Sequence, residues 1–210
     1  MKKYLHALLL GNAENVSHDH LRKLVQKADF ILAVDGGANR ALKAGITPNA
    51  IIGDLDSLSE TTRKKFPSSA LIEVSRQDNT DLEKALNWLL QHQYTDCTLC
   101  GFIGGRVDFT LGNILSLYPY AHKLNITVCG AGWKLIPVTK SLSLPCCPGK
   151  RVSLLPYKTC RNVSSTGLKY PLKKVSLSWK QAGRSLSNQT TGKRFSVSLS
   201  SGFLWLYIED

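Results

Sequence analysis

Apolar runs alternate with amphipathic segments along the first 130 residues of the chain. In the helical segments apolar residues recur three or four apart, and the clearest helix starts with a capping box formed by Thr80 and Glu83. The short apolar runs between them predict buried strands, and strands that alternate with helices predict a parallel sheet. We expect strands at 4–10, 30–35, 50–54, 97–103 and 125–130, and helices at 17–28, 36–45, 80–93 and 108–123.

The pattern changes after about residue 133. Ser, Thr, Pro and Lys become more frequent, helical spacing disappears, and short alternating or apolar stretches are separated by turn sequences such as PCCPG and TTGK. This pattern predicts an antiparallel β-sandwich or open barrel. We therefore expect an α/β protein with two domains: a doubly wound, mainly parallel sheet domain over residues 1–135, and a smaller C-terminal antiparallel β-sandwich domain over residues 136–210.

The formal charge of +12 is unevenly distributed. Residues 1–108 contain 13 Lys and Arg and 13 Asp and Glu, whereas residues 109–208 contain 14 Lys and Arg and no carboxylate. Three interpretations are open for the basic half: a solvated surface, electrostatic steering of a phosphate-bearing ligand, or nucleic-acid binding. The third has no arginine-rich tract or recognised nucleic-acid module to support it.

The six cysteines do not form a zinc-binding pattern. Cys97 and Cys100 make one CxxC, but neither a second pair nor closely spaced histidines accompany it, so buried thiols are expected. Reduced cysteines are the rule in the cytosol, and a cytoplasmic location is expected. The apolar N-terminal stretch is short and contains His6, which favours a strand over a signal peptide. No run reaches the ~18 apolar residues of a membrane span, so no membrane partner is expected.

Two acids lie one residue apart where a buried strand ends. Asp54 and Asp56 follow the run AIIG, and side chains two apart on a strand point to the same side, ~6.5 Å apart along the backbone. In a partly desolvated cleft their repulsion is about 2–3 kcal/mol at an effective dielectric constant of ~20, and a cation removes it. Carboxylate oxygens suit Mg²⁺, which proteins hold through one or two carboxylates together with phosphate oxygens.

Further acids follow other strands or open helices. Asp35 ends the second strand, Asp81 opens a helix and Asp108 follows GGR. Ligands of open α/β sheets bind beyond the carboxyl ends of the strands, so we expect these acids at one edge of the sheet. The pairs Gly36–Gly37 and Gly104–Gly105 allow close approach of a phosphate, and Arg106 is suited to grip it. Taken singly, each residue also fits a plain structural role in a turn, a helix cap or a surface ion pair.

Taken together, these motifs resemble the thiamine pyrophosphokinase family. The segments that carry the resemblance are DGGAN (35–39), GDLDS (53–57), QDNTD (77–81), GGRVD (104–108) and SN (187–188), with GLKYPL (167–172) and GFLWLYI (202–208) in the second half. Each motif is weak alone, but their order and spacing match over nearly the whole chain. The resemblance implies a homodimer that transfers the pyrophosphoryl group of ATP to the hydroxyl of thiamine, with Mg²⁺, and leaves AMP.

The resemblance also implies roles for individual residues. Asp54, Asp56 and Asp81 would hold Mg²⁺ and carry the catalytic step. Thiamine would contact Gln77, Ser187 and Asn188 and stack on Trp205, with Trp179 as the competing indole and core packing as the plain alternative. The nucleotide and its phosphates would lie against Asp35, Gly36, Gly37, Asn39, Gly104, Gly105, Arg106 and Asp108.

Two positions depart from the family pattern. Phe109 follows the acid of GGRVD, where the family often has His, and Arg76 stands where an acid is common. Two other functions remain open from the sequence: a basic nucleic-acid-binding module, and a pyrophosphokinase of this fold that acts on another alcohol. The enzyme interpretation implies thiamine and ATP as partners and no nucleic acid.

Overall fold

The computed structural model describes residues 5–13, 16–55, 59–66, 71–74 and 78–210. The chain divides into two compact units, residues 1–131 and 132–210. The division thus lies a few residues before the expected one between residues 135 and 136, which would cut strand β7 (Trp133–Val138). β7 belongs to the second unit because it pairs along its whole length with strand β13 (Ser201–Glu209).

Unit 1 is built on a parallel sheet in which the strand order reverses. The strands lie in the order β4-β3-β2-β1-β5-β6, and every neighbouring pair is parallel. From β1 the chain adds strands outward to β4, and it then continues with β5 on the other side of β1, so a topological switch point separates β1 from β5. The strands are β1 (His6–Leu10), β2 (Phe30–Val34), β3 (Ala50–Gly53), β4 (Leu71–Glu73), β5 (Asp96–Cys100) and β6 (Asn125–Gly130).

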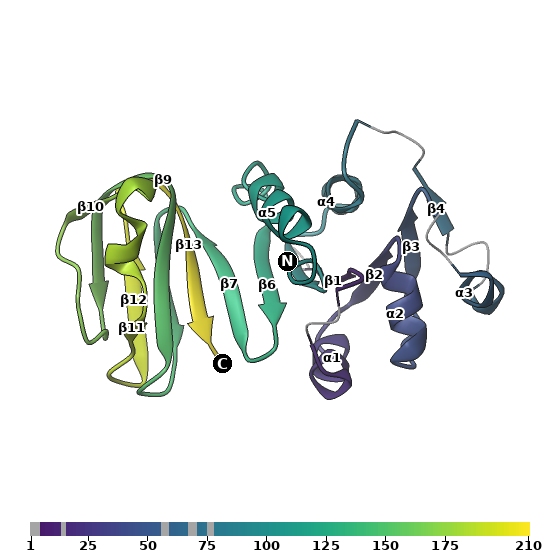
Figure 1. Ribbon diagram of the computed structural model, residues 1–210, viewed down its shortest axis with the longest axis horizontal. Coiled ribbons are helices and arrows are strands. Elements are labelled where there is room, and N and C mark those ends of the chain that lie inside the picture. Colours follow the sequence, from purple (N-terminus) through teal and green to yellow (C-terminus); the bar gives the residue numbers. More distant parts are fainter. Residues whose placement is uncertain (1–4, 14–15, 56–58, 67–70, 75–77) are drawn as a thin grey trace. The chain divides into compact units, whose positions relative to one another are not determined.

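Helices cover both faces of this sheet, with α1 and α2 on one face and α4 and α5 on the other (Figure 1). Both faces of β1 are therefore buried: Leu8 and Leu10 pack with residues of α1 and α2, while Leu9 points to the opposite side. The doubly wound α/β class expected from the sequence is confirmed. The helices are α1 (His18–Val25), α2 (Gly37–Lys43), α3 (Glu60–Lys65), α4 (Asp81–Gln91) and α5 (Val107–Ser116).

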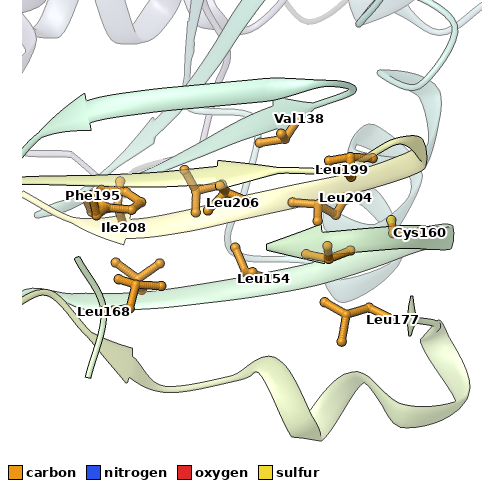
Figure 2. Close-up of a cluster of buried hydrophobic side chains, with 13 residues drawn as sticks. Val138, Leu154, Cys160, Leu168, Leu177, Phe195, Leu199, Leu204, Leu206 and Ile208 are labelled. Carbon is orange, nitrogen blue, oxygen red and sulfur yellow. The ribbon is translucent and has the colours of Figure 1, made fainter. Parts of the chain in front are cut away.

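Unit 2 is an antiparallel β domain organised around one long strand. The 16-residue strand β9 pairs with four others, β10, β11, β12 and β13, all antiparallel. The hydrophobic core of unit 2 consists of apolar residues that include Leu154, Phe195 and Leu206 (Figure 2). Besides β7 and β13, the elements are β8 (Ser141–Pro145), β9 (Arg151–Thr166), β10 (Val175–Leu177), the 3₁₀ segment η2 (Trp179–Ser185), β11 (Asn188–Gln189) and β12 (Arg194–Ser198).

Most apolar strand residues of the described segments are buried in these two units, whereas Val107, Phe109, Leu111 and Leu115 of α5 are exposed. Within that part of the chain, no helix has the length and apolar character needed to cross a membrane.

Candidate active site

A cavity of about 810 Å³ opens in unit 1 at the switch point of the sheet. Its walls come from segments that directly follow the carboxyl ends of β1, β2 and β5, together with the starts of α4 and α5. This is where the strand order predicts a ligand site. The lining residues are Gly11, Asn12, Ala13, Val34, Asp35, Gly36, Thr80, Asp81, Leu82, Gly101, Phe102, Gly104, Gly105, Arg106, Asp108, Phe109, Gly112 and Asn113.

Asp35 reaches the cavity through an unusual backbone conformation. It follows β2 directly and has a φ of 47°, in the left-handed region that a non-glycine residue seldom adopts. Its backbone N–H donates to the carbonyl of Ile52 over 2.8 Å, which ties the turn to β3. One carboxylate oxygen, Oδ1, is buried and has no hydrogen-bond partner among the described residues. A buried acceptor without a donor is costly, so this oxygen is suited to meet a cation or a hydrogen-bond donor.

Three carboxylates meet at this edge of the sheet. Asp35, Asp54 and Asp81 each offer an oxygen, and these oxygens lie within 4.8 Å of one another. They come from the ends of β2 and β3 and from the start of α4, so residues 46 positions apart in sequence are brought together by the parallel sheet. We expected these acids at one edge of the sheet, and the structure places the carboxylates of Asp35, Asp54 and Asp81 close together there. Asp35, however, was expected to contact the nucleotide and not the metal.

The start of α4 positions Asp81. Thr80 is the N-cap: its hydroxyl oxygen accepts from the backbone N–H of Glu83, and Glu83 Oε2 accepts from the backbone N–H of Thr80 over 2.9 Å. This is the capping box expected from the sequence. Asp81 is consequently the first helical residue, where the helix dipole favours a negative charge. Lys84, three residues further along, donates to Asp81 Oδ1 over 2.8 Å.

The glycine-rich turn after β5 carries a bidentate ion pair. Arg106 Nη2 lies 2.5 Å from Asp108 Oδ2, and Nε donates to Oδ1 over 3.1 Å. These hydrogen bonds hold the pKa of Asp108 below its ordinary value. The Arg106 guanidinium also lies 4.2 Å from the centre of the Phe109 ring. Phe109 thus stacks against the arginine at the position where the family often has His.

Three predicted glycines of this site are favoured by the backbone: Gly37 by close packing, and Gly104 and Gly105 by a positive φ. A Cβ on Gly37 would lie 1.9 Å from the carbonyl oxygen of Leu10, so α2 can start against β1 only with glycine at this position. Gly104 has a φ of 113° and Gly105 a φ of 74°, which favour glycine in the turn after β5. Gly104 and Gly105 line the cavity with Gly36, while Gly37 shapes the backbone behind it.

Some residues of the site were not predicted from the sequence. Gly11, Asn12 and Ala13 form the wall that follows β1, and the rule that placed the acids after strands would have found them too. Arg40 is nearly buried and donates to the carbonyls of Ala13 and Val16 over 2.6 and 3.2 Å, which fixes this wall. No pattern in the sequence distinguishes Arg40 from an exposed helical arginine.

Asn39 is not among the cavity-lining residues. Its side-chain oxygen accepts from the backbone N–H of Ser59 and from the Thr62 hydroxyl, over 3.1 and 2.7 Å. Ser59 is the N-cap of α3, so Asn39 ties α2 to the start of α3. The expected nucleotide contact of Asn39 has no support from this placement.

Ser187 and Asn188 lie in unit 2, next to β9. The backbone N–H of Ser187 donates to the Ser153 hydroxyl over 3.0 Å. The Asn188 side chain bonds both backbone groups of Tyr170, accepting from its N–H over 3.1 Å and donating to its carbonyl over 2.7 Å. Asn188 therefore holds the segment that precedes β10, and Ser187 has an exposed side chain.

Trp205 is packed in β13. It is 3% exposed and makes an edge-to-face contact with Phe203 at 5.2 Å between ring centres. Its indole Nε1 is buried without a hydrogen-bond partner among the described residues. Trp179, the competing indole, is 68% exposed. Two further predicted residues, Asp56 and Gln77, lie outside the residues that the structure describes.

Comparison with known proteins assigns both units. The catalytic domain of thiamin pyrophosphokinase matches residues 21–129, and the vitamin B1 binding domain of thiamin pyrophosphokinase matches residues 135–204. The α/β unit with its acidic cavity and the β unit that follows are thus the two parts of a transferase. The chain belongs to the thiamin pyrophosphokinase family, and the resemblance stated from the sequence motifs is confirmed.

The sequences of individual relatives align with this chain over most of its length. The chain is 30% identical to the thiamine pyrophosphokinase of Bacillus subtilis (strain 168), over 94% of each chain, and 24% identical to thiamin pyrophosphokinase 1 of Caenorhabditis elegans, over 89% of this chain and 82% of that one. Its fold is similar to the crystal structure of the Bacillus subtilis enzyme, with a TM-score of 0.84 and 99% of each chain covered. The thiamin pyrophosphokinase of Geobacillus thermodenitrificans gives a TM-score of 0.83 at 27% identity, over 99% of this chain and 98% of that one.

Proposed function

We propose that the protein transfers the pyrophosphoryl group of ATP to the hydroxyl of thiamine, giving thiamine diphosphate and AMP in a reaction that requires Mg²⁺. Membership of the family supports thiamine as the acceptor. The use of ATP with Mg²⁺ is supported by one observation: Asp35, Asp54 and Asp81 meet beside a cavity at the switch point of the sheet. A nucleotide with its metal ion is the ligand that this combination of sheet edge and carboxylates fits best.

The donor set fits Mg²⁺. Two oxygens on opposite sides of Mg²⁺ are at most ~4.2 Å apart, because each Mg–O distance is ~2.1 Å. The oxygens of the three carboxylates lie within 4.8 Å of one another, which is close to this spacing. The buried, unpartnered Oδ1 of Asp35 gives a second reason to place a cation here. Asp56, the acid two residues after Asp54, is a further proposed ligand.

The residues of the cavity supply binding and orientation. When bound, Mg²⁺ would neutralise phosphate charge. Gly104 and Gly105 allow the backbone to approach the phosphates, and Arg106 would exchange its bond to Asp108 for a phosphate oxygen. Phosphoryl transfer depends mainly on such positioning and charge neutralisation. One of the clustered aspartates would accept the proton of the thiamine hydroxyl.

The acceptor side of the proposal rests on the family resemblance. Gln77, Ser187, Asn188 and Trp205 stay predicted contacts of thiamine. The stacking role of Trp205 requires one face of its buried ring to become accessible when the ligand binds. The homodimer and the cytoplasmic location also stay predictions.

An assay of purified protein with ATP, thiamine and Mg²⁺ tests the function. We expect thiamine diphosphate and AMP in equal amounts, measured by ion-exchange chromatography. Formation of ADP with thiamine monophosphate would refute pyrophosphoryl transfer. A panel of other primary alcohols, run in parallel, separates thiamine from an alternative acceptor.

Replacing Asp54 by Asn tests the metal site. We expect kcat to fall by at least about 100-fold, since loss of residues that only support metal ligands already costs 10–100-fold. The matched control is Asp19→Asn, an exposed aspartate of α1 that pairs with Arg22 at 3.5 Å. Neither variant should unfold at a lower urea concentration than the parent protein. An unchanged kcat in Asp54→Asn would remove Asp54 from the site.

A further inference from the structure

The first turn of α4 contains a buried cation next to the acidic cluster. The Lys84 side chain is 7% exposed, and its ammonium lies 2.8 Å from Asp81 Oδ1. Another helical ion pair with the same spacing, Arg22–Asp19, is 3.5 Å long and has side chains that are 65% and 86% exposed. Lysine is rarely buried without a reason, because removing its charge from water is costly.

Lys84 contacts the cluster through Asp81. Asp35, Asp54 and Asp81 together carry three negative charges when ionised, and their oxygens lie within 4.8 Å of one another. The Lys84 ammonium offsets one of these charges. A divalent ion held by the same carboxylates would lie close to the ammonium, with Asp81 between them. Two cations at such a distance repel, and burial weakens the screening by water.

We propose that Lys84 is an internal counter-cation of the acidic cluster, which competes with a divalent ion for Asp81 and thereby weakens binding of the free ion. This inference rests on the proposed function for the identity of the cluster as a metal site. Its consequence is that one of the three negative charges of the ionised cluster is already offset before a metal ion binds. The free ion then binds less tightly than three clustered carboxylates alone would bind it.

Titration of the chelator-treated protein with Mn²⁺ alone, followed by calorimetry, tests this. Mn²⁺ prefers the same oxygen ligands as Mg²⁺. We expect Lys84→Met to bind Mn²⁺ about tenfold more tightly than the parent protein, a coupling of ordinary size between two sites. Lys84→Arg, which keeps the charge, should bind within about twofold of the parent protein. The control Arg22→Met removes a cation of the same spacing in α1 and should change nothing.

Lys84→Gln keeps the proposal testable if the Met variant does not fold. Gln removes the charge but keeps a donor for Asp81, so it should also tighten Mn²⁺ binding. Equal or weaker binding in the charge-removing variants would overturn the proposal, because Lys84 would then only orient Asp81. A gain in affinity is a result that structural damage would not produce. The Mn²⁺ result decides the role of Lys84 even if the AMP-forming assay fails, so the two failures are distinguishable.

Discussion

At the scale of the residue, the site contains a side chain, Asp35, whose backbone conformation and burial are energetically unfavourable without a ligand. Asp35 combines a left-handed backbone with a buried oxygen that lacks a donor among the described residues. Each of these features costs free energy, and such strain tends to be found at functional sites. The sequence motif DGGAN indicated that Asp35 matters. It did not indicate the turn that directs Asp35 towards Asp54 and Asp81, because that turn depends on a backbone bond to Ile52 in the neighbouring strand.

A buried thiol in β5 makes the stability of unit 1 sensitive to alkaline pH. Burial, and then the charge of Asp96, raise the pKa of Cys97 from 9.0 to about 12. Below pH 9 the thiol is protonated in both states, and its contribution to stability is fully present. As pH rises from about 9 towards 12, only the unfolded state loses the proton. The free energy of unfolding should therefore fall by up to about 1.4 kcal/mol per pH unit from this group.

Urea unfolding at pH 8, 9 and 10 in the presence of a reductant measures this slope. Cys97→Ala should show a shallower loss of stability with pH than the parent protein. Cys147→Ala, which changes an exposed thiol, should keep the parent slope. Equal slopes in all three proteins would show that the Cys97 thiol does not contribute.

At the scale of the element, strong patterns were read correctly and weak ones were not. Helix α4 has both a capping box and an apolar face, and it begins within a residue of its predicted start. Helix α3 was missed because Thr62 is its one buried residue among those described, so it has no apolar stripe. The role of Asn39 was missed for the same reason: its partners cap a helix that the pattern did not reveal. The acids were singled out because they follow strands or open a helix, positions that the sequence does show.

The contact between α2 and β1 gives a prediction for this scale. Gly37→Ala would place a Cβ 1.9 Å from the Leu10 carbonyl oxygen, and neither backbone can move away without disturbing the sheet. We expect a loss of at least about 2 kcal/mol in the free energy of unfolding, as for other overpacked sites. Urea denaturation followed by circular dichroism measures it.

Gly112→Ala is the matched control within α5. Nothing lies within 4 Å of a Cβ at this position, so alanine should stabilise the helix by about 0.5–1 kcal/mol. If Gly37→Ala unfolded at the same urea concentration as the parent protein, the close approach of α2 and β1 would be in doubt.

At the scale of the whole molecule, charge and chemistry are distributed unequally. The acids of the proposed metal site lie in unit 1, whereas residues 109–208 contain 14 cationic side chains and no carboxylate. The fold class and the two-unit division follow from the change of pattern near residue 133. The placement of β7 in unit 2 could not be predicted from that change of pattern, because it depends on pairing with β13, some 70 residues later.

A net charge of +12 favours the approach of an anionic substrate, and salt should weaken that effect. We expect kcat/KM for Mg·ATP to fall several-fold between low and high ionic strength, with little change in kcat. Thiamine is a cation, so at saturating ATP its kcat/KM should not fall with added salt. Steady-state rates at a series of KCl concentrations measure both. A parallel fall for the two substrates would point to a general effect of salt on the enzyme and exclude steering.

The order of strands in unit 2 has a consequence for synthesis of the protein. Strand β13 pairs with both β7 and β9, yet it is translated after every other strand of the unit. A nascent chain that has reached residue 200 would hold two exposed strand edges that await one partner. Unit 1 has all its strands by residue 130 and can fold earlier on the ribosome. Unit 2 is thus protected from aggregation and proteolysis only after β13, a strand of nine residues, has been added to its sheet.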